Sequence, residues 1–164
     1  MRTSVVLLLL ALSPSTAMRL VLQRVKSASV SVDGSVVTSI GKGILALVGL
    51  HSKDTTDDLS YCARKLAGAK LWSNENGKTW RKSAKQLEYE VLLVSQFTLY
   101  GDVSNKKHCP DFKDSMRSSD GAEEMYGVFR CCSASTSSLL RLTSSLLSLF
   151  APPHLRLIFS FLLL

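Results

Sequence analysis

Two hydroxyl groups, a carboxamide and an aromatic ring fall within the four residues Ser95-Gln96-Phe97-Thr98, directly after the apolar run Val91-Leu92-Leu93-Val94. Groups of this kind could bind a polar ligand or assist a hydrolysis. Because no His, Lys or carboxylate stands close to Ser95 or Thr98 in the sequence, a nucleophilic triad is not indicated, and any general base must come from elsewhere in the fold. Hydroxyls at a strand end also commonly satisfy only local backbone groups. Both roles stay open on the residues alone.

The thiols and imidazoles predict no metal site. The four cysteines contain no CxxC pair, and the three histidines show no paired spacing such as HxxxH. We therefore expect no metal and no cofactor. His108-Cys109, beside Lys106-Lys107, could form a reactive thiolate, but an inert loop is the interpretation that we favour.

Strands and one helix precede the polar residues. Alternation over residues 20–32, the Asp33-Gly34 turn signal and residues 36–40 predict a β-hairpin. The apolar run 44–50 predicts a strand covered on both faces, and residues 54–67 predict a helix that packs on the sheet. Glu88–Tyr100 is the longest predicted strand, with Ser95 and Phe97 on one face and Thr98 on the other. A second helix is predicted to begin near 119–120, with a capping box between Asp120 and Glu123, and to be cut off after Arg130.

Charge divides the chain into three parts. The 164 residues are 46% hydrophobic, which fits one globular domain. The formal net charge is +7, which favours an anionic partner such as nucleic acid or a membrane surface. All 13 acidic residues lie between Asp33 and Glu124. We therefore predict an N-terminal extension over 1–17, a folded domain over 18–130, and a divergent Ser/Leu-rich tail over 131–164.

The two ends carry alternative interpretations. Arg2, the apolar run 5–12 and the small residues Ser15 and Ala17 have the outline of a short targeting signal with cleavage before Met18. Alternatively, Met18 is the true start and the first 17 residues are an upstream extension. The tail over 131–164 could be a membrane-associating segment. We favour a wrong exon or reading frame, because Pro152-Pro153 interrupts it and its leucines follow neither a helical nor a strand period.

Several segments of the central region resemble the D-aminoacyl-tRNA deacylases. They cover about Met18 to Arg130 in the family's order, and Gln23-Arg24-Val25 and Ser95–Leu99 are the most specific. In full they are MRLVLQRVKSASVSVDG, IGKGILALVGL, GKTWRKS, VSQFTLY, CPDFKDSM and AEEMY.

The resemblance implies an α+β fold with a small barrel-like, mixed or antiparallel sheet and two packed helices, acting as a homodimer. The implied reaction is hydrolysis of the ester of D-aminoacyl-tRNA, and of mischarged glycyl-tRNA, as proofreading in translation quality control. It also implies that Ser95 and Phe97 bind the substrate and that Gln96, Phe97 and Thr98 are catalytic, Thr98 being the debated nucleophile. We prefer oxyanion stabilisation by backbone N–H groups around Gln96-Phe97-Thr98, with an attacking Thr98 hydroxyl as the second choice.

The implied partner is tRNA, and the basic residues that could bind its phosphates include Lys82, Lys85, Lys106 and Lys107. We expect a cytoplasmic location, or an organelle if residues 1–17 are a targeting signal. No membrane partner is required.

One family motif is absent. The family carries a Gly-cis-Pro element that rejects L-amino acids, and this sequence contains no Gly-Pro dipeptide. We also expect the family's final strands to be missing and a sheet edge to be left uncovered. The alternative function is therefore a catalytically compromised nucleic-acid-binding paralogue, or a truncated isoform without the chiral filter. For the chain as printed, the expectation is weak or absent D-specific hydrolysis.

Overall fold

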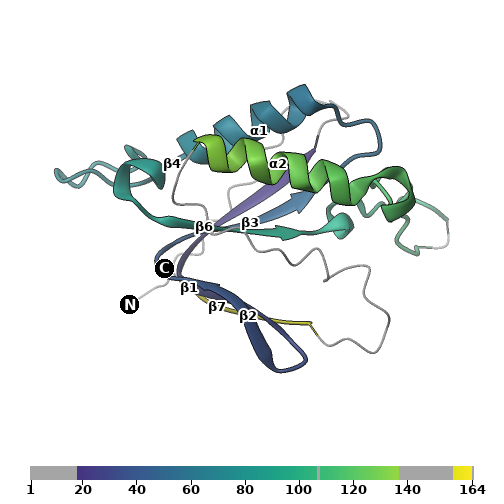
Figure 1. Ribbon diagram of the computed structural model, residues 1–164, viewed down its shortest axis with the longest axis horizontal. Helices are drawn as coiled ribbons and strands as arrows, with labels where there is room; N and C mark the ends of the chain where they lie inside the picture. The colour runs from purple at the N-terminus through teal and green to yellow at the C-terminus, as the bar shows by residue number, and fades with distance from the viewer. Residues whose placement is uncertain (1–17, 107, 137–156, 164) are drawn as a thin grey trace.

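The computed structural model describes residues 18–106, 108–136 and 157–163. Its two α-helices lie on one face of a strongly curved mixed sheet (Figure 1). The strands are β1 (Arg19–Val32), β2 (Ser35–Ile40), β3 (Gly43–Gly49), β4 (Lys70–Trp72), β5 (Lys82–Ser83), β6 (Glu90–Ser95) and β7 (Leu157–Leu163). The helices are α1 (Thr56–Gly68) and α2 (Ala122–Thr136), with short 3-10 turns η1 (Lys85–Leu87), η2 (Phe97–Tyr100) and η3 (Ser118–Asp120).

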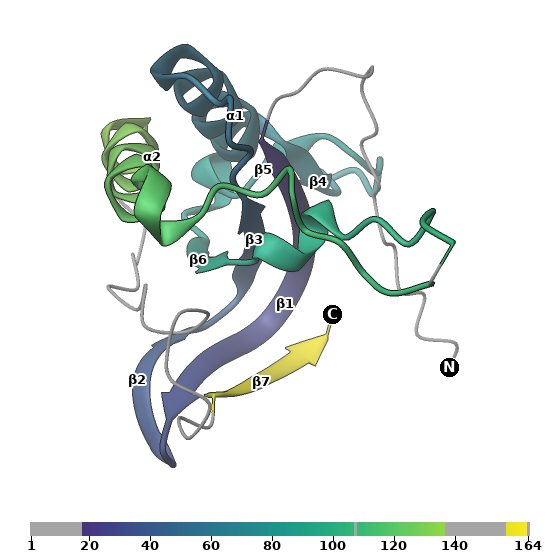
Figure 2. The same cartoon turned by 90° about the vertical axis from the view of Figure 1, so that its right-hand side faces the viewer.

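A long antiparallel arm forms the first half of the sheet. The predicted hairpin is confirmed: Asp33 and Gly34 both have positive φ, at 50° and 83°, as the tight turn requires. Val25 pairs with Gly43 and Ala28 pairs with Ile40, so β2 and β3 follow one another along the same edge of β1. The hairpin end of this arm bends away from the helices (Figure 2).

The second half of the sheet is a parallel crossover. β3 and β6 pair in parallel, from Gly43 opposite Glu90 to Val48 opposite Ser95, and α1 lies in the connection between them. Ile44, Ala46 and Val48 pack in the core beneath the helices, whereas Leu45 joins a second buried cluster on the other face of the sheet. The predicted two-sided burial of this strand is therefore confirmed.

Helix α1 follows the predicted pattern. Thr55 and Asp58 form a reciprocal capping box at its start, in which the Asp58 carboxylate accepts from the Thr55 backbone N–H at 2.9 Å. Its buried residues face the sheet and are Leu59, Ala63, Leu66 and Ala67. Charged side chains of the helix, such as Arg64 and Lys65, are exposed.

Helix α2 begins later and ends later than predicted. Ser118–Asp120 forms η3, and Gly121, at φ 84°, turns the chain before α2 starts. The expected capping box between Asp120 and Glu123 does not form, because the Asp120 carboxylate accepts from the backbone N–H of Arg117 instead. The helix continues past Arg130 to Thr136 with Ser133 buried, so part of the predicted divergent tail belongs to a packed helix.

The sheet edge expected to be bare is also occupied. Strand β7 pairs antiparallel with β1 from Val25 to Val32. Since β2 pairs with Ala28–Val32 as well, β7 lies on the opposite edge of β1, as Figure 2 shows. The expectation of an uncovered edge was wrong: a backbone ladder needs little side-chain periodicity, and the missing period of two in this segment gave no strand signal.

Candidate active site

The polar residues singled out from the sequence lie where β6 ends. The strand stops at Ser95, Gln96 leaves extended geometry, and Phe97–Tyr100 forms the 3-10 turn η2. The prediction of one strand from Glu88 to Tyr100 was therefore wrong at both ends. It follows that the strand alternation, which put Ser95 and Phe97 on one face and Thr98 on the other, does not apply beyond Ser95.

Main-chain contacts hold the turn against β3. The Gln96 N–H donates to the carbonyl of Val48 at 2.7 Å, and the Gly101 N–H closes the turn on the Thr98 carbonyl at 3.0 Å. No acceptor in the described ranges receives the N–H of Phe97 or Thr98. Such unpaired N–H groups are usual at the start of a helical turn, where they are available to a ligand.

Close packing fixes the position of η2. A Cβ added to Gly49 would lie 3.1 Å from Leu99 Cβ and 3.2 Å from the Gln96 carbonyl oxygen. The rings of Phe97 and Phe112 meet edge to face, with centroids 5.1 Å apart. This contact links η2 to the loop that follows it.

Arg19, at the start of β1, also contacts the turn. Its Nη1 donates to the Leu99 carbonyl at 2.6 Å, and its guanidinium lies over the Tyr100 ring, 4.4 Å from the centroid. Arg19 stands 80 residues before Leu99, so no local sequence pattern indicated this contact. Tyr100 is buried, and that burial raises the pKa of its hydroxyl well above the ordinary range, so Tyr100 is no base at neutral pH.

The segment is accessible. Thr98 is exposed, and Ser95, Gln96 and Phe97 are half-buried. Gln96 Nε2 donates to Thr98 Oγ1, and within the described ranges no carboxylate, imidazole or amine contacts that oxygen. A hydroxyl oxygen that accepts a hydrogen bond and lacks a base is poorly activated for attack. The local geometry therefore favours the backbone N–H groups of Phe97 and Thr98, and not the Thr98 hydroxyl, as the groups that carry out chemistry at this site.

The candidate lysines do not gather at the turn. Lys82, in β5, lies 3.7 Å from Glu75 as a surface ion pair, and Lys85, in η1, is exposed near the first residues of β6. Ser95 ends that strand, about 16 Å from its first residue at the usual rise per residue. Lys106 is exposed in the loop after η2, and Lys107 lies outside the described residues.

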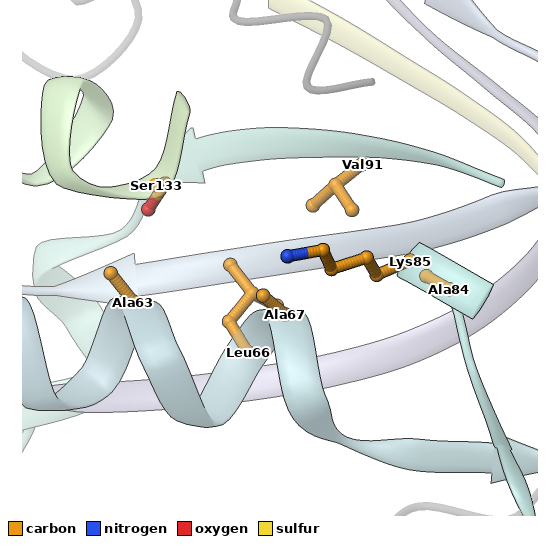
Figure 3. A pocket seen from close by; sticks show the side chains of 7 residues that line it. All are labelled: Ala63, Leu66, Ala67, Ala84, Lys85, Val91 and Ser133. Atoms are coloured by element: carbon orange, nitrogen blue, oxygen red, sulfur yellow. The ribbon is translucent and has the colours of Figure 1, made fainter. Parts of the chain in front are cut away.

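A separate small cavity lies between the two helices and η1. Figure 3 shows the Lys85 side chain reaching between Val91 and Leu66 there. Apart from Lys85 and Ser133, its lining is apolar, and it includes none of the residues from Ser95 to Thr98. This cavity is therefore distinct from the candidate site.

Comparison with known proteins supports the fold and the family. Residues 21–139 match a family described as D-Tyr-tRNA(Tyr) deacylase. The chain is 47% identical over 104 residues to a D-aminoacyl-tRNA deacylase 1 of Leishmania major, covering 63% of this chain and 67% of the relative. It is 46% identical over 112 residues to a D-aminoacyl-tRNA deacylase of Drosophila melanogaster, covering 68% of each.

A further D-aminoacyl-tRNA deacylase, from Dictyostelium discoideum, is 44% identical over 91 residues, which are 55% of this chain but only 60% of the relative's length. Among solved structures, a c-Myc DNA unwinding element binding protein superposes with a TM-score of 0.74 at 31% identity, covering 87% of this chain and 90% of its own. A probable eukaryotic D-amino acid tRNA deacylase has a TM-score of 0.67 at 16% identity, covering 89% and 94% respectively, and so shows the fold alone. The predicted α+β fold, with a curled sheet and two packed helices, is confirmed.

Proposed function

The chain belongs to the D-Tyr-tRNA(Tyr) deacylase family, and on that premise we propose that it hydrolyses the ester bond of D-aminoacyl-tRNA. The products are the free amino acid and tRNA, as in proofreading of aminoacyl-tRNA. The observation that carries the proposal is the family match, which includes the accessible segment from Ser95 to Thr98. The implied activity on mischarged glycyl-tRNA belongs to the same proposal.

The reaction needs few side chains. In the proposed mechanism a water oxygen adds to the ester carbonyl carbon, and the N–H groups of Phe97 and Thr98 donate to the oxyanion that forms. One such donor typically contributes about 2.7–4 kcal/mol to the transition state. The acyl C–O bond to the ribose then breaks. The neighbouring ribose hydroxyl of the substrate takes the proton that the attacking water loses and gives its own proton to the leaving ribose oxygen. Ser95 and the Phe97 ring bind the aminoacyl-adenosine, and Gln96 lies beside the reacting carbonyl.

Partners and compartment follow from this substrate. We propose that the exposed Lys106 contacts tRNA phosphates near the site, whereas Lys82 and Lys85 contribute only to binding of more distant phosphates. Assembly as a homodimer is part of the proposal, supported by the resemblance to the family. A cytoplasmic location, or an organelle that translates, is where charged tRNA would meet the protein.

The test is hydrolysis of matched D- and L-aminoacyl-tRNA by the purified protein. Because the sequence has no Gly-Pro dipeptide, we expect hydrolysis with weak preference for the D-ester. Strong preference for the D-ester would support the proposed hydrolysis, but it would contradict the expectation that rejection of L-amino acids needs a Gly-Pro dipeptide. Binding of tRNA without any hydrolysis would overturn the proposed activity and favour the nucleic-acid-binding alternative.

A further inference from the structure

The connection between β4 and β5 carries an exposed tryptophan. Figure 1 shows this connection reaching out from the sheet beside the label β4. Trp80 is 43% exposed, whereas Trp72, at the end of β4, is buried. Tryptophan side chains are highly buried on average, and the candidate active site does not use this ring. Trp80 is therefore a candidate for contact with a ligand.

Backbone hydrogen bonds hold Trp80 in place. Before it, the Asn74 N–H donates to the Lys78 carbonyl at 2.9 Å, and the Lys78 N–H donates to Asn74 Oδ1 at 2.9 Å. After it, the Arg81 N–H donates to the Trp72 carbonyl at 2.8 Å. Trp80 itself has φ 59°, a left-handed conformation that is rare for an aromatic residue and persists only where the surrounding structure imposes it. The ring is thus presented to solvent by a fixed backbone.

Arg24, in β1, supports the ring from one side. Its Nη1 donates to the Leu71 carbonyl at 2.9 Å, and its guanidinium carbon lies 5.8 Å from the centre of the Trp80 ring. A guanidinium group over an aromatic face is attracted to the π electrons, which helps to fix the ring. Since the ring stays 43% exposed beside Arg24, a flat group can stack on the part that is open to solvent.

The segment that carries Trp80 is strongly basic. Residues 70–85 contain five basic side chains and one acidic side chain, that of Glu75, which lies 3.7 Å from Lys82. The five are Lys70, Lys78, Arg81, Lys82 and Lys85. Lys78 and Arg81 stand closest to Trp80 in the sequence, and both are exposed. An aromatic ring for a base, with cations for the phosphates beside it, is the combination that binds single-stranded nucleic acid.

We propose that Trp80 is a stacking platform for an unpaired nucleotide of RNA. The base lies on the exposed part of the indole ring, and Lys78 and Arg81 contact the neighbouring phosphates. Arg24 stands five residues after Arg19 in β1, about 17 Å along the strand, so the platform binds a part of the tRNA away from the acylated end. The identification of the RNA as tRNA rests on the proposed function, whereas the stacking site rests on the residues around Trp80.

Binding of unacylated tRNA and of a single-stranded RNA oligonucleotide to the full chain tests the platform. Trp80→Ala should raise both Kd values about 5- to 150-fold, the usual loss for one stacked base, and Trp80→Phe should recover most of it. Tyr61→Ala is the matched control and should leave Kd unchanged. Tyr61 is 48% exposed with the Lys65 ammonium 5.1 Å from its ring centre, but Asp57 and Asp58 lie in the first turn of the same helix. No binding by the unaltered protein, or equal Kd values in the two alanine variants, would overturn the platform.

Salt dependence separates stacking from charge attraction. Because the indole ring is uncharged, Trp80→Ala should weaken RNA binding by the same factor at every salt concentration. Arg81→Gln should instead reduce the slope of log K against log salt concentration by about 0.7. A Trp80→Ala effect that disappears at high salt, or displacement of the RNA by polyglutamate as effectively as by unlabelled RNA, would overturn the platform.

Trp80→Gly controls for folding, because glycine adopts a left-handed φ without strain. This variant should have a Tm no lower than that of Trp80→Ala and should bind RNA equally weakly. Binding restored in Trp80→Gly would show that the loss in Trp80→Ala is a folding defect, which would overturn the platform.

Hydrolysis of a D-aminoacyl-adenosine, which is too short to reach the platform, keeps the two proposals apart. Trp80→Ala should hydrolyse this ester at the unaltered rate, while its KM for D-aminoacyl-tRNA rises. RNA binding that depends on Trp80, without hydrolysis by the unaltered protein, would support the platform and contradict only the proposed function. Hydrolysis of D-aminoacyl-tRNA with a Kd for tRNA that does not depend on Trp80 would overturn only the platform.

Discussion

Thr98 is the residue whose side-chain role can be separated from that of the backbone around it. Its hydroxyl is exposed and accepts from Gln96, while the amides of Phe97 and Thr98 do not depend on the side chain. We expect Thr98→Ala to keep hydrolysis of D-aminoacyl-tRNA within about tenfold of the unaltered protein, because the amide donors remain. Initial rates with saturating and limiting substrate measure this effect. A loss of about 10⁴-fold or more with an intact fold would instead identify Thr98 as the nucleophile.

We infer that Arg19 is a positioning residue for η2. From β1, Arg19 contacts the Leu99 carbonyl and the Tyr100 ring, both in η2. Removing its side chain should therefore loosen η2, although we do not expect Arg19 itself to contact the substrate. We expect Arg19→Ala to lower kcat/KM about fivefold, since a hydrogen bond from a charged group at an exposed site contributes about 1 kcal/mol.

Arg19→Lys should recover part of that loss, because an ammonium group can still donate to the carbonyl. Arg64→Ala, on the exposed side of α1, is the matched control and should have no effect. Equal losses in the two alanine variants would point to tRNA charge attraction rather than positioning of the turn.

At the scale of elements, the junction between β6 and η2 depends on the close approach of β3. Gly49→Ala would place a Cβ 3.1 Å from Leu99 Cβ and 3.2 Å from a ring carbon of Tyr100. We expect η2 to shift by a few tenths of an ångström and the free energy of unfolding to fall by about 1–3 kcal/mol. Because the shift displaces the amide donors, kcat should fall by a larger factor than KM rises.

Gly68→Ala is the matched control, since a Cβ at Gly68 meets nothing within 4 Å. Denaturant unfolding and steady-state kinetics on both variants measure the two effects. Unchanged kinetics in Gly49→Ala would show that the position of η2 is not critical.

Local sequence patterns predicted the elements that depend on residues close together in the sequence. The hairpin turn at Asp33-Gly34, the two-sided burial of 44–50 and the capped start of α1 each follow from residues near one another in the sequence. The change from strand to 3-10 turn at Gln96 does not follow from nearby residues. It depends on packing against Gly49 and on the contact with Arg19, both of which are distant in the sequence. The segment that matters chemically was found from its residue types, but its backbone geometry was not.

At the scale of the whole molecule, β7 closes an edge of the sheet with the last residues of the chain. Its pairing with β1 links Leu157–Leu163 to the strand that carries Arg19. Exposed strand edges promote association between chains. We therefore expect β7 to protect this edge of β1 from pairing with other chains.

Ser160→Pro tests this protection, because proline cannot donate to the ladder opposite Ser29. We expect faster amide hydrogen exchange in residues 27–32 and increased aggregation, whereas Ser160→Ala should behave as the unaltered protein. Exchange followed by mass spectrometry on both variants measures the difference. Unchanged exchange in the proline variant would show that β7 does not protect this edge in solution.

We expect the main-chain N–H groups of η2 to recognise the acylated 3′ end of tRNA. Backbone amide NMR signals, recorded while a non-hydrolysable adenosine that carries a D-amino acid through an amide at its 3′ position is added, measure this recognition. The Phe97 and Thr98 amide signals should shift until the site is saturated, together with those of their neighbours Ser95 and Gln96. Saturable binding that leaves these signals in place, and shifts those of the cavity between α1 and α2 instead, would show that η2 is not the binding site.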